Sequence, residues 1–308
     1  MMVLPRLIVV LGPTASGKSA LGIWLAQRLG GQILVCDSTQ VYRHFNIGTA
    51  KIPPAEQQGI AHHLVDLVEP EEVFTAGEYR RRALEVLEQV CHRRAVPILT
   101  AGSGLYLRAL LEGLAEAPVR TEELRERLRA KAKLHGPQHL HRLLQRLDAE
   151  SAKRIASCDT QKVIRAIEMR LVTGRPVGDI YRGGREPLAG YEVIKIGLLP
   201  ARTALYHRIH ERIDAMVRAG WIEEVRQLIE GGVPAGAKPF QFIGYSEWRD
   251  YLAGQLSKNE ALERIQQATR NFAKRQITWF RKEKAVHWLE GFGDSPEISS
   301  AALLRIQS

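Results

Sequence analysis

Short apolar runs alternate with helical periodicity through the first third of the chain. Residues 7–11 are continuously apolar and end at Gly12, and residues 18–29 then carry apolar side chains at helical spacing. Similar apolar runs occupy residues 33–36 and 96–100, and residues 191–199 have the pattern of another strand that returns to the sheet. Strands that alternate with helices in this way are typical of a parallel sheet covered by helices. The pattern therefore predicts an α/β fold.

Polar or glycine-rich segments follow three of the predicted strands. Residues 12–19 follow the first strand, Asp37 and Ser38 follow the second, and the small-residue turn 101–104, which contains Ser103, follows the run at 96–100. In open parallel sheets, ligands bind beyond the carboxyl ends of the strands. We therefore expect these three segments to share one crevice.

The pattern changes between residues 119 and 186, which are helical in spacing and rich in arginine. These residues hold 16 lysines and arginines against 9 aspartates and glutamates, a net +7 out of +10 for the whole chain. We interpret residues 116–189 as a basic helical insertion domain that contacts a phosphate backbone, within a core made of residues 1–115 and 190–308. That core should include a long helix at about 257–283 and end in a loose tail after Gly291.

Charge, apolar content and cysteine spacing narrow the class of protein. A net charge of +10 and an isoelectric point near 9.7 over 308 residues favour a polyanionic partner. No apolar run reaches the roughly 20 residues of a membrane span, and no secretory signal precedes the first strand, so we expect a cytoplasmic protein without a membrane partner. The three cysteines are widely spaced, which argues against a disulfide framework or a zinc site and predicts reduced, buried thiols: Cys36, Cys91 and Cys158.

Residues 12–19 satisfy the phosphate-loop pattern G-x-x-x-x-G-K-[ST] and lie between a predicted strand and a predicted helix, as that pattern requires. The residues expected to hold the phosphates are Gly12, Pro13, Thr14, Ala15, Ser16, Gly17, Lys18 and Ser19. Backbone N–H groups and the Lys18 ammonium would bind phosphate oxygens, and the Ser19 hydroxyl would ligate Mg²⁺. The fold is then a P-loop NTPase-like parallel sheet flanked by helices. The loop itself accepts a nucleoside triphosphate or another pyrophosphate, which leaves a kinase and a prenyltransferase both open.

Further blocks carry a family resemblance that separates these two classes. They are DSTQVY at 37–42, IGTAK at 47–51, HHLVD at 62–66, FTAGEYRR at 74–81, AGSGLY at 101–106, DTQKVIRAIE at 159–168, FIGYSE at 242–247 and KRQITWFR at 274–281. In this order, from about residue 6 to residue 290, they resemble the tRNA dimethylallyltransferase (tRNA isopentenyltransferase) family, in its bacterial form without a C-terminal zinc finger. Two segments depart from the family pattern: Ala101-Gly-Ser-Gly-Leu-Tyr106 stands where Gly-Gly-Thr-x-Leu-Tyr is usual, and Ile52 replaces the proline that usually follows GTAK.

The resemblance implies a reaction and roles for the site residues. The dimethylallyl group of dimethylallyl pyrophosphate would pass to the exocyclic N6 amine of the adenosine immediately 3′ of the anticodon in tRNA. Lys18 and Mg²⁺ would stabilise the leaving pyrophosphate, and Asp37 would accept the amine proton. Ser103 would bind the leaving phosphate or the base. From the residues alone, the alternative for Asp37 is a Walker-B-like metal ligand or a helix cap. The Ser103 hydroxyl could also cap the helix that follows, and this role is compatible with substrate binding.

The same resemblance places the tRNA anticodon stem-loop against both parts of the chain. An adenine must leave its stack to react, and single-stranded loops are the usual targets of sequence-specific RNA readers. The positions that match family contacts are Asp37, Ser38, Thr39, Gln40, Ser103, Arg125, Gln161, Lys162, Val163, Ile164, Arg165, Gln241, Gly244 and Tyr245. For residues 161–165 the alternative is an ordinary solvated helix face.

Three other classes of protein are compatible with parts of this sequence. A P-loop small-molecule or nucleoside kinase would use the same loop, Mg²⁺ and aspartate. An isopentenyltransferase for free nucleotides would not need the basic insertion, and a non-catalytic RNA-binding protein would not need an intact phosphate loop. We expect a monomer, a structural role for His62 and His63, and core packing in preference to RNA stacking for residues 279–280.

Overall fold

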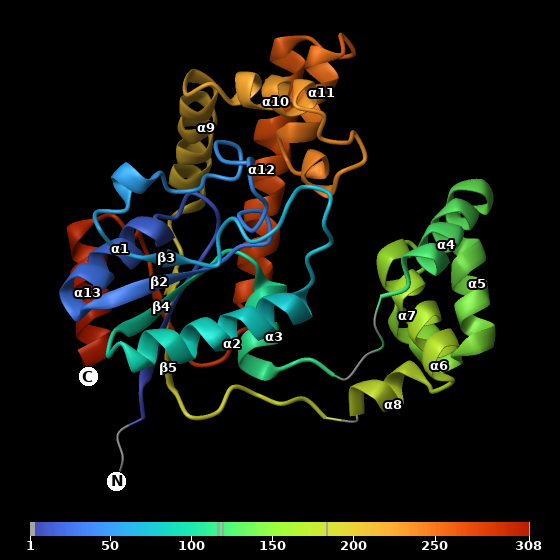
Figure 1. Cartoon of the computed structure of the whole chain (residues 1–308), viewed down its shortest axis with the longest axis horizontal. Helices are drawn as coiled ribbons and strands as arrows, with labels where there is room; N and C mark the ends of the chain where they lie inside the picture. Colours follow the sequence, from blue (N-terminus) through green and yellow to red (C-terminus); the bar gives the residue numbers. More distant parts are fainter. Residues whose placement is uncertain (1–3, 116–117, 119, 183, 308) are drawn as a thin grey trace. The chain divides into compact units, whose positions relative to one another are not determined.

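The chain forms two compact units in this computed structural model, which describes residues 4–115, 118, 120–182 and 184–307. The first, called here the core unit, comprises Met1–Leu111 and Ala189–Ser308. The second, called the inserted unit, comprises Glu112–Leu188. In Figure 1 the inserted unit is the group of helices α4 to α8, coloured green to yellow.

The core unit is built on a parallel sheet, which confirms the predicted fold class. Six strands lie in the order β3-β2-β4-β1-β5-β6. Strands β2, β3, β4 and β5 are labelled in Figure 1. Their bounds are β1 Arg6–Leu11, β2 Gly31–Cys36, β3 His62–His63, β4 Val96–Ala101, β5 Glu192–Leu198 and β6 Val286–Leu289. The central strand β1 pairs in parallel with β4 and with β5, and its apolar residues are buried because both faces of the sheet are covered.

Helices cover the two faces of this sheet. Helices α1 (Lys18–Leu29) and α13 (Pro296–Gln307) bury apolar side chains against one face. Helix α2 (Ala76–His92) packs on β2 and β4, and α3 (Gly104–Glu112) follows β4. The prediction of a loose tail after Gly291 was wrong, because Ala302 and Ile306 of α13 are buried in the core beside α1.

The C-terminal helices of the core unit surround a cluster of large aromatic side chains. These helices are α9 (Arg202–Arg218), α10 (Trp221–Glu230), α11 (Tyr245–Leu252) and α12 (Lys258–Phe280). Trp221, Tyr245 and Trp248 are almost fully buried and pack on one another edge to face. Helix α12 begins at a capping box in which Ser257 and Glu260 exchange hydrogen bonds. The C-terminal part of α12, residues 274–280, lies near the phosphate loop, because Gln276 bonds to Thr14 and to Gly102.

The inserted unit is entirely helical in its described residues. It comprises α4 (Glu122–His135), α5 (Pro137–Leu147), α6 (Ala149–Arg154), α7 (Thr160–Thr173) and α8 (Val177–Arg182) around its own apolar core. One carboxylate, Glu168, is fully buried within it.

The structure also bears on the predictions about the cysteines and about membrane spans. Of the cysteines predicted to be buried, only Cys36 is; Cys91 is half-buried and Cys158 is exposed. Among the described residues, no helix combines the length and the apolar composition that a membrane crossing requires.

Candidate functional site

The phosphate loop depends on a glycine at position 17. It joins β1 to α1 and turns through Gly17, whose φ of 85° is left-handed. A side chain at this position would also lie 2.7 Å from the Asp294 carboxylate and from the Gly293 nitrogen. Gly293 N donates to Ser16 O at 2.9 Å, so the segment after β6 packs directly on the loop. Glycine is therefore needed at position 17 for both conformation and space.

Two basic groups face the loop, and the Asp37 carboxylate favours the charged form of both. The Lys18 ammonium donates to Pro13 O at 2.7 Å, and the Arg212 guanidinium of α9 donates to Thr14 Oγ1 at 3.3 Å. Burial and the neighbouring Arg212 lower the pKa of Lys18 to about 7, and burial also lowers the pKa of Arg212. Within the described residues neither forms an ion pair. Both side chains are partly buried, so an anion at the loop would stabilise the charged form of each.

Asp37 and Ser103 lie at adjacent strand ends, as expected from topology. One Asp37 carboxylate oxygen accepts from Thr39 N at 2.9 Å and from the Thr39 hydroxyl at 2.7 Å. The other lies against Gly102, where a Cβ would come within 2.6 Å of it. The Ser103 hydroxyl accepts from Ser38 N at 2.8 Å and contacts the Ser38 hydroxyl. It therefore ties two strand ends together.

A cavity of about 660 Å³ joins these groups. Of the residues singled out from sequence, it is lined by Thr14, Ala15, Lys18, Ser19, Asp37, Thr39, Gln40 and Gln241. Arg212, Lys51 and Gln276 also line it, and no sequence argument assigned a role to any of the three. A second cavity of about 430 Å³ borders residues 15–20 and has Arg208 and Asp294 in its wall. The phosphate loop thus opens into a space large enough for a base and a short apolar chain.

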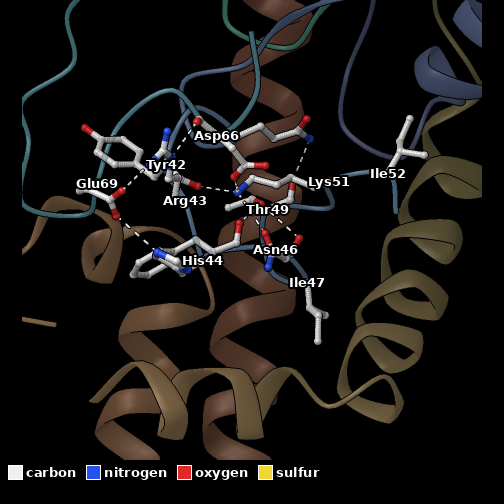
Figure 2. Close-up of polar contacts among 12 residues, drawn as sticks. Tyr42, Arg43, His44, Asn46, Ile47, Thr49, Lys51, Ile52, Asp66 and Glu69 are labelled. Atoms are coloured by element: carbon white, nitrogen blue, oxygen red, sulfur yellow. Dashed lines mark hydrogen bonds and ion pairs between the residues drawn. The ribbon is translucent and has the colours of Figure 1, made fainter. Parts of the chain in front are cut away.

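The wall of the larger cavity between residues 42 and 69 is held by a buried lysine (Figure 2). Lys51 Nζ donates to Tyr42 O and to Asp66 Oδ1, both at 2.5 Å, and to Asn46 Oδ1 at 3.1 Å. Only 8% of its side chain is exposed, and burial lowers its pKa. Ala50 and Asp66, on either side of this contact, have left-handed φ angles of 56° and 51°. Such conformations persist only where surrounding contacts fix them.

Gly244 and Tyr245 support the same wall from behind. Tyr245 is fully buried; its hydroxyl donates to Glu224 Oε1 at 2.6 Å and accepts from Gly48 N at 3.1 Å. A side chain on Gly244 would lie 2.0 Å from the Trp221 ring. In this structure the two residues are packing elements with no side-chain atoms available to tRNA, whereas Gln241 is exposed at the cavity. A tRNA contact by Gln241 stays a prediction.

The predicted tRNA contacts of the inserted unit divide into exposed and buried residues. Gln161 and Lys162 are exposed on α7, where Lys162 pairs with Asp159 at 2.5 Å. Val163 and Ile164 lie in the core of the unit, so their side chains cannot meet tRNA without local unfolding.

The two arginines among these predicted contacts are both paired with Glu168. Arg125 bonds both carboxylate oxygens, at 2.8 and 2.6 Å, and Arg165 bonds the second oxygen as well as Pro118 O. Burial alone would raise the pKa of Glu168, but the two arginines lower it to about 2. In this structure Arg125 and Arg165 therefore stabilise the inserted unit by pairing with Glu168.

His62 and His63 form β3, and each ring bonds within the protein. His62 Nδ1 lies 2.9 Å from Ile60 O, and His63 Nε2 lies 2.8 Å from the Gln32 side chain. Phe280 is buried, whereas Trp279 is 40% exposed and covers Gly104, so the prediction of core packing holds only for the phenylalanine.

Comparison with known proteins decides the family. The IPP transferase family model matches residues 40–283. The tRNA dimethylallyltransferase of Solibacter usitatus is 48% identical over 301 residues, covering 97% of each chain. The chain belongs to the IPP transferase family. Among solved structures of this family, the tRNA isopentenylpyrophosphate transferase of Bacillus halodurans superposes with a TM-score of 0.71 at 34% identity, covering 98% of this chain and 97% of that one. A eukaryotic dimethylallyltransferase solved acting on tRNA gives a TM-score of 0.83 at 26% identity, covering 98% and 78% respectively.

Proposed function

We propose that this member of the IPP transferase family transfers the dimethylallyl group of dimethylallyl pyrophosphate to N6 of the adenosine immediately 3′ of the anticodon in tRNA. The products are N6-isopentenyladenosine and pyrophosphate. The observation that carries the proposal is the cavity that has Lys18 and Arg212 at the phosphate loop and Asp37 in its wall. A cytoplasmic location and a monomeric state stay predictions.

The phosphate loop and its two cations would bind the pyrophosphate of the donor. Charge grows on that group as its bond to the allylic carbon breaks, and preorganised N–H donors and cations stabilise such charge without reorganisation. Lys18, with its pKa near 7, gains most from the interaction because the anion restores its charge. The prenyl chain would extend into the larger cavity beside residues such as Val35 and Ile213.

Mg²⁺ would be held by the Ser19 hydroxyl together with the pyrophosphate oxygens. Ser19 is exposed at the loop, and this donor set fits an ion that keeps several waters and takes few protein ligands. When bound, the ion would neutralise part of the charge on the leaving group.

Asp37 is the carboxylate placed to take the proton of the attacking amine. Thr39 occupies one of its oxygens through two hydrogen bonds, which fixes the carboxylate and leaves the other oxygen beside Gly102. A positioned general base contributes about 100- to 10,000-fold in rate. We therefore expect Asp37→Asn mainly to lower the rate of the chemical step, by that range.

The test is a mass-spectrometric assay of an unmodified anticodon stem-loop incubated with the protein, Mg²⁺ and dimethylallyl pyrophosphate. The expected result is a prenyl mass gain on the adenosine 3′ of the anticodon, lost in Asp37→Asn. Asp250→Asn, which removes a partly exposed aspartate paired with Arg249 on α11, is the matched control and should behave as wild type. Absence of the gain, with ATP consumed in a parallel reaction, would instead identify a kinase.

The inserted unit would bind the phosphate backbone of the same tRNA. Its net charge and the exposed Lys162 support this proposal. Lys162→Glu should weaken stem-loop binding, lower the dependence of log Kd on log salt by about 1 to 2, and leave donor affinity unchanged. Lys153→Glu on α6 is the control for charge alone, because that lysine is equally exposed and also pairs with a neighbouring carboxylate. Equal affinities for wild type and Lys162→Glu would exclude this contact.

A further inference from the structure

Gln276 is a polar residue on the buried stripe of α12. Ala273 and Phe280, one turn to either side, are fully buried, and Gln276 itself is 6% exposed. A buried carboxamide destabilises a protein unless its hydrogen bonds are made. The contacts of this side chain therefore explain why a glutamine stands where an apolar residue would otherwise pack.

The carboxamide connects the phosphate loop to the turn after β4. Gln276 Oε1 accepts from Thr14 N at 2.7 Å, and Gln276 Nε2 donates to Gly102 O at 2.8 Å. The orientation of the amide is unambiguous, because a backbone N–H can only donate and a carbonyl oxygen can only accept. One side chain thus spans the two loops, which lie 88 residues apart in the sequence.

Each loop reached by Gln276 carries a different half of the chemistry. Thr14 belongs to the loop that holds the pyrophosphate, and its hydroxyl also meets Arg212. Gly102 lies against Oδ2 of Asp37 and precedes Ser103, and both Gly102 N and Ser103 N donate to Cys36 O at 3.0 Å. A shift of the Gly102 peptide would therefore move the wall against which Asp37 rests.

We propose that Gln276 is a positioning residue that sets the separation between the phosphate loop and the Gly102–Ser103 turn. This inference rests on the proposed prenyl transfer, in which the allylic carbon on the pyrophosphate must come within about 3 to 3.5 Å of the amine. A misplacement of about 1 Å typically lowers the rate about 100-fold. Gln276 contributes to the rate through the placement of both loops, without contact with the reacting atoms.

Gln276→Met keeps the length of the side chain and removes both hydrogen bonds. We expect a single-turnover rate about 100-fold below wild type at saturating substrates, with Kd values for pyrophosphate and for the anticodon stem-loop changed by less than about threefold. Gln267→Met is the control: it is the same substitution on the same helix, at an exposed position whose contacts are to Arg270 and Asn271. It should retain the wild-type rate.

Gln276→Asn keeps the amide but shortens its reach by one C–C bond, about 1.5 Å. The shorter amide can bond to Thr14 or to Gly102 but not to both, so the single-turnover rate of this variant should also fall. Gln276→Asn therefore tests the proposal if Gln276→Met does not fold. Two results would overturn the positioning role: normal turnover in either folded variant, or a reduced rate that returns to the wild-type value at saturating substrate. In both cases, prenyl transfer by the wild-type protein would still support the proposed function. A wild-type protein that transfers no prenyl group would overturn both.

Discussion

The buried carboxylate of the inserted unit offers the most quantitative prediction. Glu168→Gln keeps the size of the side chain and removes its charge, which leaves Arg125 and Arg165 beside a neutral amide. The exposed fractions of these side chains are 0% for Glu168, 16% for Arg125 and 29% for Arg165, so water replaces the lost partner poorly. We expect the inserted unit to lose stability and the core unit to keep it.

The size of the loss follows from the pKa of Glu168. Folding lowers it from 4.5 to about 2, and a difference of this size corresponds to about 3 kcal/mol of stability at neutral pH. Because the folded pKa is the lower one, this stability is complete above pH 4.5 and declines as the pH falls toward 2. For a unit of this size, about 3 kcal/mol lowers Tm by roughly 10 to 20 °C.

The distribution of tryptophan allows the two units to be followed separately. All five tryptophans lie outside residues 112–188, so their fluorescence reports the core unit, whereas far-ultraviolet circular dichroism reports the helices of both. In Glu168→Gln, part of the dichroism should melt earlier while the fluorescence transition stays in place. Glu150→Gln, at an exposed ion pair with Lys153, should change the stability of the same unit by less than about 1 kcal/mol.

Two results would refute this reasoning. One is a Glu168→Gln protein whose dichroism melts at the wild-type temperature, which would mean that the two arginines do not depend on the carboxylate. The other is a difference between wild type and variant that does not shrink as the pH is lowered from 5 toward 3. In that case the loss would come from packing and not from the charge of Glu168.

Three further predictions concern the core unit. Lys51→Met should lower the stability of the core unit by about 3 kcal/mol, because the buried acceptors around the ammonium lose their donor. Urea unfolding followed by tryptophan fluorescence measures this stability. An unchanged unfolding midpoint would contradict the prediction. Pyrophosphate should bind more weakly as the pH rises past about 7, because Lys18 must then take up a proton when the anion binds. Calorimetry at pH 8 in buffers of different ionisation enthalpy measures this proton uptake, after the protons bound by pyrophosphate itself are subtracted. A binding reaction without proton uptake by the protein would contradict the prediction. Gly244→Ala should cost about 2 to 3 kcal/mol through contact with Trp221 and a φ of 92°, whereas Gly236→Ala, which has open space around it, should be neutral in the same unfolding assay.

The parts of the fold that sequence predicted are those with a strong local signal. The strand ending at Gly12, the phosphate loop and helix α1 follow from consecutive residues, and the predicted helix at 257–283 begins at the capping box of Ser257. The convergence of Asp37 and Ser103 followed from the rule that parallel strands end at one edge. Each of these inferences needs only a short window of sequence.

The contacts that sequence did not predict join residues far apart in the chain. Lys51 is an ordinary surface lysine by composition, and only the fold surrounds it with Tyr42 O and Asp66. Glu168 lies 43 positions from Arg125, so the run of arginines was interpreted as exposed when part of it is paired internally. The tail was misjudged because α13 has a weak apolar pattern and becomes ordered only by packing on α1 and the sheet.

The hydrogen bonds from the C-terminal third to the phosphate loop have a consequence for synthesis on the ribosome. Thr14 N and Ser16 O find their partners on Gln276 and Gly293, and β1 pairs with β5, which emerges about 180 residues later. Domains generally fold as units, also during translation. The contacts that fix the phosphate loop can therefore be completed only after residues 276 and 293 have been synthesised, although β1 can pair with β4 much earlier.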